Sequence, residues 1–236
     1  RKNLHLYAPA ASIHDPQKLP DLPLVTADYD ETKQCLVFKS YDQGELQDVQ
    51  KLTCPAPELH HLGHLAVTYQ IMRECFEVTE DLQAMLDNFQ NEGSRGTYHQ
   101  IGDVTVIDDA YNASPESMRA AFMSLKQRKV KNAIACIAAV NELGDRAAEL
   151  HEQIGQDLVK SGVFREVLML KEHHEDYIRG MKAAQATIPY AVFDDRSAML
   201  EGLIKRLKPG DIVLLKGSNS YGLSALVPAL QEVKGA

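Results

Sequence analysis

Residues 104–118 place chemically useful side chains directly after an apolar run, in the order VTVIDDAYNASPESM. Asp108 and Asp109 follow that run, and Tyr111 and Asn112 come shortly after them. Carboxylate and amide groups can hydrogen-bond sugar hydroxyls or base edges, and a tyrosine ring can stack on a base. The pattern therefore predicts a nucleotide-binding corner, and solvated aspartates in an Asx-type turn are the alternative interpretation.

A second polar cluster, KGSNS, follows the last strongly apolar run, DIVLL. Lys216 offers a cation that could bind an anionic group of a substrate, and Gly217 would let the backbone approach a ligand closely. Ser218 and Asn219 extend the polar cluster beyond the strand. The alternative for Lys216 is a surface lysine at a strand end, without a functional role.

The elements that position both clusters are alternating strands and helices, which begin at residue 104. Apolar runs spaced in this way are typical of a Rossmann-like α/β fold, a mostly parallel sheet with helices on both faces. The carboxyl ends of such strands meet at one edge, where ligands bind, so we expect the two clusters to lie together. The predicted strands are VTVID, AIACIA, EVLML, YAVF and DIVLL, and the predicted helices lie near 115–127, 145–161, 174–185, 196–207 and 222–233.

The first of these helices has a recognisable start. Pro115 suits the first helical position, Ser114 the N-cap, and Glu116 the positive end of the helix dipole. Ser114 and its two neighbours therefore predict helix-starting chemistry, which leaves the residues before them for binding.

Residues before 94 follow another pattern. The runs PLVTADYD, QCLVFKSYD and LQDVQKLTC alternate apolar and polar residues, which predicts antiparallel strands with one solvated face. A helix is predicted over LGHLAVTYQIMRECF, and a second one over TEDLQAMLDNF with Thr79 as its cap. The polar stretch NEGSRG predicts a hinge between two domains, and we place the domain boundary near residue 93.

Composition limits the possible partners. The chain has 236 residues, of which 44% are hydrophobic and 25% charged, with a formal net charge of −8. It carries no lysine- or arginine-rich block, so we expect no nucleic-acid partner, and no apolar stretch approaches the ~20 residues that span a bilayer. The start, RKNLHLYAPAAS, lacks the apolar core of a signal peptide. The four cysteines, Cys35, Cys54, Cys75 and Cys136, are scattered along the sequence, and we expect them to be core residues. This usage of cysteine favours a cytoplasmic protein.

Several histidines receive simpler interpretations. His60, His61 and His64 include an i,i+4 pair, but no cysteine or carboxylate at ligand spacing joins them, so we expect no metal site there. His151 is interpreted as an ordinary helix-face residue. The segment at His173 and His174 is expected to be a solvated helix start, and the DDR at 194–196 is expected to cap the next helix.

The ordered motifs resemble those of the Mur ligase family, most closely the members that add D-alanyl-D-alanine to a UDP-N-acetylmuramoyl tripeptide. IDDAYNASPESM is similar to the family motif D-D-S-Y-N-A-N-P-x-S-M, and PGDIVLLKGSNS to P-G-D-x-V-L-V-K-G-S-R. NELGDRAAELHEQIG is similar to E-L-G…H-x-x-x-G, and PELHHLGHLAVTY stands where the family has G-x-H-N-x-x-N-A-L-A-A. The resemblance covers roughly residues 20–236, including the hinge matched by SRG.

The resemblance implies a domain plan and a reaction. Residues 1–93 would be the C-terminal portion of a central ATPase domain, and 94–236 a complete Mur ligase C-terminal domain. The family activates a carboxylate as an acyl phosphate with ATP and Mg²⁺, and an amine then attacks it. Partners would be ATP, a UDP-muramoyl peptide and a dipeptide amine, in peptidoglycan precursor synthesis.

The resemblance also implies residue roles. Lys216 would be catalytic, steadying the carboxylate or the acyl phosphate. Nucleotide contacts are predicted for Asp109, Tyr111, Asn112, Arg95 at the hinge, Asp108 and His60, and substrate contacts for Lys216, Gly217, Ser218 and Asn219.

Some family features are absent or changed. No G-x-x-x-x-G-K-S/T loop occurs in the sequence, so this chain alone is expected to be inactive, and the metal ligands are expected in missing N-terminal and central regions. Asn219 replaces an arginine, Ala138–Val140 replaces G-D-M, Ser114 replaces an asparagine, and His60 and Gly63 replace asparagines. These changes leave two alternatives: a ligase with another acceptor, of cyanophycin or folylpolyglutamate type, or a non-catalytic nucleotide-binding remnant.

Overall fold

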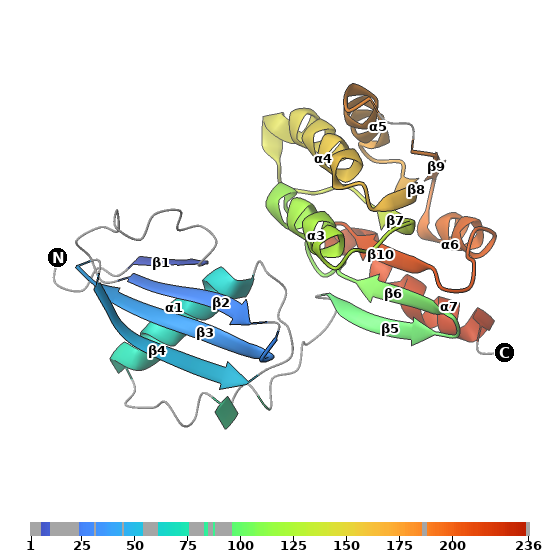
Figure 1. The fold of residues 1–236 in the computed structure, drawn as a ribbon. Coiled ribbons are helices and arrows are strands. Elements are labelled where there is room, and N and C mark those ends of the chain that lie inside the picture. The colour runs from blue at the N-terminus through green and yellow to red at the C-terminus, as the bar shows by residue number, and fades with distance from the viewer. Residues whose placement is uncertain are drawn as a thin grey trace. The chain divides into compact units, whose positions relative to one another are not determined.

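The computed structural model describes residues 6–9, 24–30, 32–43, 45–53, 61–75, 83–84, 87, 96–185 and 188–234. The chain divides into two units, Arg1–Gln90 and Asn91–Ala236 (Figure 1). No helix within the described ranges is long and apolar enough to cross a membrane. Most of the predicted TEDLQAMLDNF helix, with Thr79, lies outside the described residues, as does Cys54.

The N-terminal unit is a four-stranded sheet with a helix on one face. Its strands are β1 (Leu6–Pro9), β2 (Leu24–Asp30), β3 (Cys35–Asp42) and β4 (Glu45–Thr53), in that spatial order. The pairs β2–β3 and β3–β4 are antiparallel, as predicted, whereas β1 runs parallel to β2 and was not predicted. Helix α1 (His61–Cys75) buries Leu62, Ala66 and Tyr69 in one cluster with apolar residues of the sheet. These three residues, spaced four and three positions apart, therefore form the packing face of the predicted helix.

The C-terminal unit contains a six-stranded sheet in the order β5-β6-β10-β7-β8-β9. All neighbouring strands in it run parallel except β5, which pairs antiparallel with β6 at the edge. The Rossmann-like, mostly parallel sheet predicted from the sequence is therefore confirmed. The strands are β5 (Thr97–Ile101), β6 (Val104–Asp108), β7 (Ala133–Ile137), β8 (Phe164–Leu170), β9 (Tyr190–Phe193) and β10 (Ile212–Lys216).

Helices cover both faces of this sheet (Figure 1). One buried cluster joins the sheet to α3 (Pro115–Gln127), α4 (Ala147–Ser161) and α5 (His174–Ala183). The other joins it to α6 (Arg196–Ile204) and α7 (Leu226–Lys234). Alternation along the strands produces the two cores, because successive side chains point to opposite faces: in β7, Ala133 and Ala135 lie in the first cluster, and Ile134 and Cys136 in the second. Cys136 is thus a core residue, as predicted.

The start of α3 has the predicted chemistry. Ser114 is the N-cap, and its Oγ accepts a hydrogen bond from the Ser117 backbone N–H at 3.1 Å. The Ser117 hydroxyl accepts one from the Ser114 N–H at 2.9 Å, which completes a capping box. Hydrogen bonds from the Glu116 backbone N–H and from the Ser114 hydroxyl lower the pKa of the Glu116 carboxyl. Asp195 caps α6 in the same way, accepting from the Ala198 N–H, as expected for the DDR segment.

Removing this cap gives a modest, testable loss. Ser114→Ala should lower the free energy of unfolding of the C-terminal unit by about 1 kcal/mol, because the Ser117 N–H loses its acceptor. Urea unfolding followed by circular dichroism measures the change. Ser197→Ala, at an exposed position in the first turn of α6, is the control and should change stability by less than about 0.5 kcal/mol. Equal losses in the two variants would contradict the capping role.

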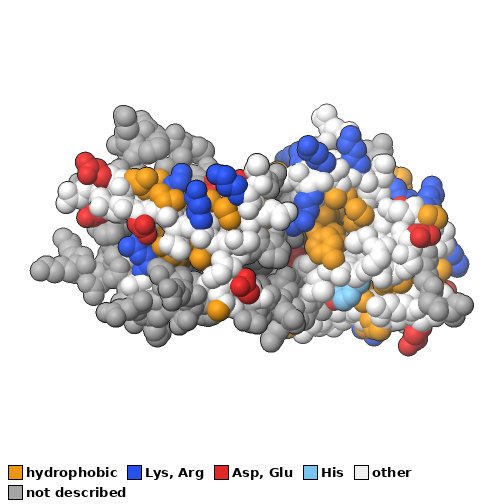
Figure 2. Space-filling view, turned by 60° about the horizontal axis from the view of Figure 1, so that its bottom comes forward, with side chains coloured by type: hydrophobic (Ala, Val, Ile, Leu, Met, Phe, Trp, Pro, Cys, Tyr) orange, Lys and Arg blue, Asp and Glu red, His pale blue; other side chains and the backbone are white. Residues whose placement is uncertain are grey.

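The surface of the C-terminal unit in Figure 2 carries hydrophobic side chains beside lysines and arginines. Tyr98 on the edge strand β5 is 46% exposed. The guanidinium carbon of Arg128 lies 5.6 Å from its ring centroid, a cation–π contact that partly covers the ring. Arg128 therefore lies over part of an aromatic ring that the edge strand would otherwise present to solvent.

Candidate functional site

The connections of the sheet identify where a ligand would bind. Strand β10 lies between β6 and β7, which lead into α3 and α4 on one face, whereas β10 leads into α7 on the other face. Neighbouring strands whose connections leave in opposite directions open a crevice at their carboxyl ends, and open α/β sheets bind ligands there. The two polar clusters predicted from the sequence both end at this crevice, at Asp108–Asp109 after β6 and Lys216–Ser218 after β10.

An ion pair joins the two clusters. The Lys216 ammonium donates to Asp109 Oδ2 at 2.6 Å and to the Asp109 main-chain oxygen at 3.3 Å. The Lys216 side chain is 2% exposed and the Asp109 side chain 23% exposed. The carboxylate is therefore partly open to solvent at the carboxyl edge of the sheet, whereas the ammonium is buried and fixes the orientation of the carboxylate.

Asp108 lies deeper than Asp109. It is 4% exposed, and its Oδ1 accepts from the Ser224 hydroxyl at 2.9 Å and from the Ala110 N–H at 3.3 Å. Ser224 belongs to the short 3-10 segment Leu223–Ala225, which precedes α7. Asp108 thus ties the end of β6 to the 3-10 segment before the last helix, and its predicted nucleotide contact stays a prediction.

Tyr111 and Asn112 project at the surface of the same corner. Tyr111 is 47% exposed. The Asn112 side-chain oxygen accepts from the Ala113 N–H at 2.8 Å, which orients its NH₂ group away from the backbone. This arrangement suits a planar ligand beside a polar edge.

The β10 exit is closely packed against the β7 exit. A Cβ on Gly217 would lie 2.7 Å from the Ala138 Cβ, so the glycine is required by the neighbouring strand. Ser218 donates its N–H to Ala139 O at 3.1 Å, and its hydroxyl accepts from the Asn141 N–H at 2.9 Å. Among the four predicted substrate contacts, Lys216, Gly217 and Ser218 are buried and Asn219 is exposed.

Asn141, at this edge of the sheet, was missed by sequence reasoning. Asn141 donates its side-chain N–H to the Ser220 hydroxyl at 2.8 Å, which fastens the loop after β7 to the loop after β10. A polar residue directly after the AIACIAAV run was the available signal. Arg95 and His60, both predicted as nucleotide contacts, lie outside the described residues.

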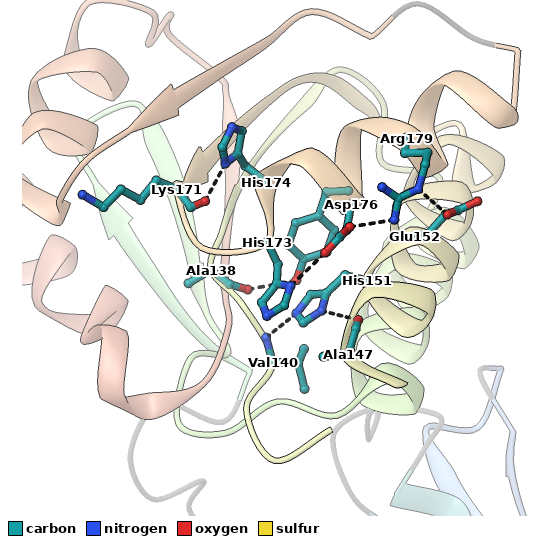
Figure 3. Close-up of polar contacts among 11 residues, drawn as sticks. Ala138, Val140, Ala147, His151, Glu152, Lys171, His173, His174, Asp176 and Arg179 are labelled. Atoms are coloured by element: carbon teal, nitrogen blue, oxygen red, sulfur yellow. Dashed lines mark hydrogen bonds and ion pairs between the residues drawn. The ribbon is translucent and has the colours of Figure 1, made fainter. Parts of the chain in front are cut away.

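His151 corrects an expectation. It was interpreted as an ordinary helix-face residue, but its side chain is buried, with 0% exposure. Its Nε2 accepts from the Val140 N–H at 3.0 Å, and its Nδ1 lies 2.6 Å from Ala147 O (Figure 3). Burial lowers the pKa of His151, so the neutral ring is favoured.

His173 is likewise more than a solvated helix start. Its ring stacks on His151 with centroids 4.1 Å apart and planes 6° apart, and its Nδ1 lies 2.8 Å from Asp176 Oδ2. Arg179 binds both Asp176 and Glu152, each at 2.6 Å, which links α5 to α4 (Figure 3).

His151, His173 and Asp176 form the one group of three metal-ligand side chains found in the described part of the chain, with donor atoms within 4.8 Å of each other. Lone pairs of imidazole lie in the ring plane, and two parallel stacked rings cannot direct them at one ion. The Nε2 lone pair of His151 already accepts the Val140 N–H. This group therefore does not fit a metal ion.

Comparisons with known proteins identify the family of the chain. Residues 94–219 match the family model described as Mur ligase, glutamate ligase domain. A curated relative from Mycobacterium tuberculosis, UDP-N-acetylmuramoyl-tripeptide--D-alanyl-D-alanine ligase, is 35% identical over 145 residues, covering 54% of this chain and 28% of that protein.

Solved structures share the fold. MurF from Acinetobacter baumannii matches with a TM-score of 0.69 and 24% identity, covering 88% of this chain and 45% of that one. The MurF ligase from Thermotoga maritima, solved in complex with ADP, matches with a TM-score of 0.64 and 23% identity, covering 92% and 47%.

The C-terminal unit is thus an open α/β domain with polar side chains gathered at the carboxyl edge of its sheet. Because the family model covers more than half of its residues, the chain belongs to the Mur ligase family. It spans 28% of the Mycobacterium tuberculosis relative and less than half of the Acinetobacter baumannii structure.

Proposed function

We propose that this chain is part of an ATP-dependent amide ligase that joins D-alanyl-D-alanine to a UDP-N-acetylmuramoyl tripeptide through an acyl phosphate, in peptidoglycan precursor synthesis. The observation that carries the proposal is the corner from Asp108 to Asn112, which meets Lys216 at the crevice beside β10. The relative from Mycobacterium tuberculosis, named for this reaction, supports it. On this proposal, residues 94–236 are the domain that covers the nucleotide.

The geometry supports specific roles toward ATP. The partly exposed Asp109 carboxylate can accept hydrogen bonds from ribose hydroxyls, and the exposed Tyr111 ring can stack on a base. Asn112 offers its NH₂ group at the same edge. Lys216 would act through Asp109, because its ammonium holds the Asp109 carboxylate in place. A direct contact between Lys216 and the acyl phosphate would require this ion pair to separate. ATP would supply the phosphoryl group that activates the carboxylate.

Magnesium is assigned to other parts of the enzyme. Mg²⁺ prefers oxygen ligands in an octahedral arrangement, commonly one or two carboxylates with phosphate oxygens. In the ranges that the structure describes, the one three-residue group at ligand distance contains two histidines and does not fit. The proposal therefore places no Mg²⁺ ligand among the described residues. It keeps the expectation that the metal ligands and the phosphate-binding loop belong to upstream regions, since the sequence has no G-x-x-x-x-G-K-S/T motif.

The complete protein from the full reading frame tests this function. Incubated with ATP, Mg²⁺, UDP-N-acetylmuramoyl tripeptide and D-alanyl-D-alanine, it should release inorganic phosphate and form the pentapeptide product. Omitting D-alanyl-D-alanine should abolish product formation. Absence of product under conditions where the Mycobacterium tuberculosis enzyme is active would refute the proposal.

One observation favours a second acceptor as the alternative. Asn219 is exposed at the position where the family resemblance places an arginine, so this position offers no cation to pair with an acceptor carboxylate. A ligase of cyanophycin or folylpolyglutamate type would turn over with another amine, and a screen of amino acids and dipeptides separates the two. A nucleotide-binding remnant is the non-enzymatic alternative, and an intact phosphate loop in the upstream reading frame would exclude it.

A further inference from the structure

The loop after β7, residues 138–143, is held from two sides. On the sheet side, Ala138 donates its N–H to Lys216 O at 3.1 Å, and Ala139 O accepts from the Ser218 N–H at 3.1 Å. On the helix side, the Val140 N–H binds His151, and Ala138 O accepts the Tyr177 hydroxyl at 3.1 Å (Figure 3). The loop that carries Asn141 is thus fixed between the β10 exit and two buried side chains.

The partners of His151 define its tautomer. The Val140 N–H can only donate, so Nε2 must carry a lone pair. The Ala147 carbonyl can only accept, so Nδ1 must carry the proton. The ring is therefore the neutral Nδ1–H form, and an imidazolium would present a proton to the Val140 N–H.

The surroundings hold the ring in this orientation. His173 stacks on one side, and the Tyr177 ring meets it edge-on, with centroids 5.0 Å apart and planes at 90°. The titratable and charged groups facing the ring come from α5 and the residue before it: His173, Asp176 and Tyr177, with Arg179 paired to Asp176. From its own helix, Glu152 is neutralised by the same Arg179.

We propose that His151, as the neutral Nδ1–H tautomer, is a positioning residue that sets the loop after β7 and so places Asn141 against the Ser218–Ser220 exit of β10. It acts through Val140 and touches no ligand. The link from this loop to catalysis rests on the proposed function, whereas the loop position itself does not.

A pH dependence follows from this geometry. Burial and the neighbouring His173 lower the pKa of His151 below its value in the unfolded chain, which is about 6.5. The unfolded chain then binds the proton first, so the stabilising contribution is complete above about pH 6.5 and is lost as the pH falls through the lowered pKa. Opening of the Val140 amide should follow the same protonation.

Two variants of the full 236-residue chain test the inference. Gln places an oxygen near the position of Nε2 and can accept from Val140, whereas Asn reaches only the position of Nδ1 and can donate to Ala147. His151→Gln should keep the Val140 amide protected from hydrogen exchange within about threefold, and His151→Asn should lose at least about fivefold. In the unmodified chain, histidine ¹⁵N shifts should report an unprotonated Nε2. The hydrogen-exchange protection of the Val140 amide should decrease as the pH is lowered in the unmodified chain, and it should not change with pH in His151→Gln.

Each outcome is decisive. Equal protection in the two variants, or an Nε2–H tautomer, would overturn the positioning role. The Asn141 and Ser218 amide shifts should move in His151→Asn and stay in His151→Gln, which a general loss of stability in both variants would not produce. Because these readouts need no ATP and no substrate, they distinguish failure of this inference from failure of the proposed function.

Discussion

Asp109→Asn is expected to destabilise the C-terminal unit by about 3 kcal/mol, more than the loss of its partner Lys216. The substitution leaves an ammonium that is 2% exposed without its anion. Lys216→Met leaves a carboxylate that is 23% exposed and can recover water, so its cost should be about 1–2 kcal/mol. The asymmetry follows from the unequal burial of the two charges.

Urea unfolding of the two single variants and the double variant forms a double-mutant cycle. The double variant should be more stable than Asp109→Asn, because no unpaired buried charge remains, with a coupling of about 1–3 kcal/mol. Asp103→Asn, at an exposed position in the turn between β5 and β6, is the control and should lie within about 0.5 kcal/mol of the unmodified chain. A larger loss for Lys216→Met than for Asp109→Asn would contradict the geometry described above.

The same variants separate two roles of Lys216 in the complete ligase. If Lys216 only orients Asp109, both single variants should lose comparable activity, because Lys216→Met removes the group that orients the carboxylate and Asp109→Asn removes the carboxylate itself. If Lys216 contacts the reacting groups, Lys216→Met should lose far more activity than Asp109→Asn. Phosphate release at saturating substrate measures the difference.

Local sequence patterns predicted most of the fold. The run VTVID coincides with β6 and YAVF with β9, and the helix predicted over 115–127 has the observed bounds. These elements depend on apolar periodicity and on caps such as Ser114, which act over a few residues. Strand β5, in contrast, was missed, because TYHQI is short and polar and pairs only as the edge of the sheet.

The parts of the site that were not predicted depend on distant residues. Asp109 and Lys216 lie 107 positions apart and pair only because β10 inserts between β6 and β7. The burial of His151 likewise depends on a loop from another strand and a ring from another helix. A single sequence predicted that polar groups would meet at the carboxyl edge, but not which of them would neutralise each other.

The close approach of α4 and α5 leads to the second large effect. A Cβ on Gly180 would lie 1.9 Å from Glu152 O, and one on Gly155 would lie 2.2 Å from Tyr177 O. Each glycine of the pair thus meets the backbone of the opposite helix, which cannot move aside alone. The spacing of these helices also sets the stack of His173 on His151.

Gly180→Ala should therefore destabilise the unit by about 2–3 kcal/mol, although alanine in a helix interior is normally favoured over glycine by up to about 1 kcal/mol. Gly202→Ala is the matched control in α6, because its Cβ would meet the tip of the Phe193 ring at 2.4 Å, a side chain that can turn. The intrinsic helix preference is the same in both variants, so the difference in their urea midpoints isolates the backbone contact.

Equal midpoints would mean that α4 and α5 are not in backbone contact. A larger loss for Gly180→Ala, together with a shifted His173 ring resonance, would show that this helix spacing holds the histidine stack beside the loop after β7.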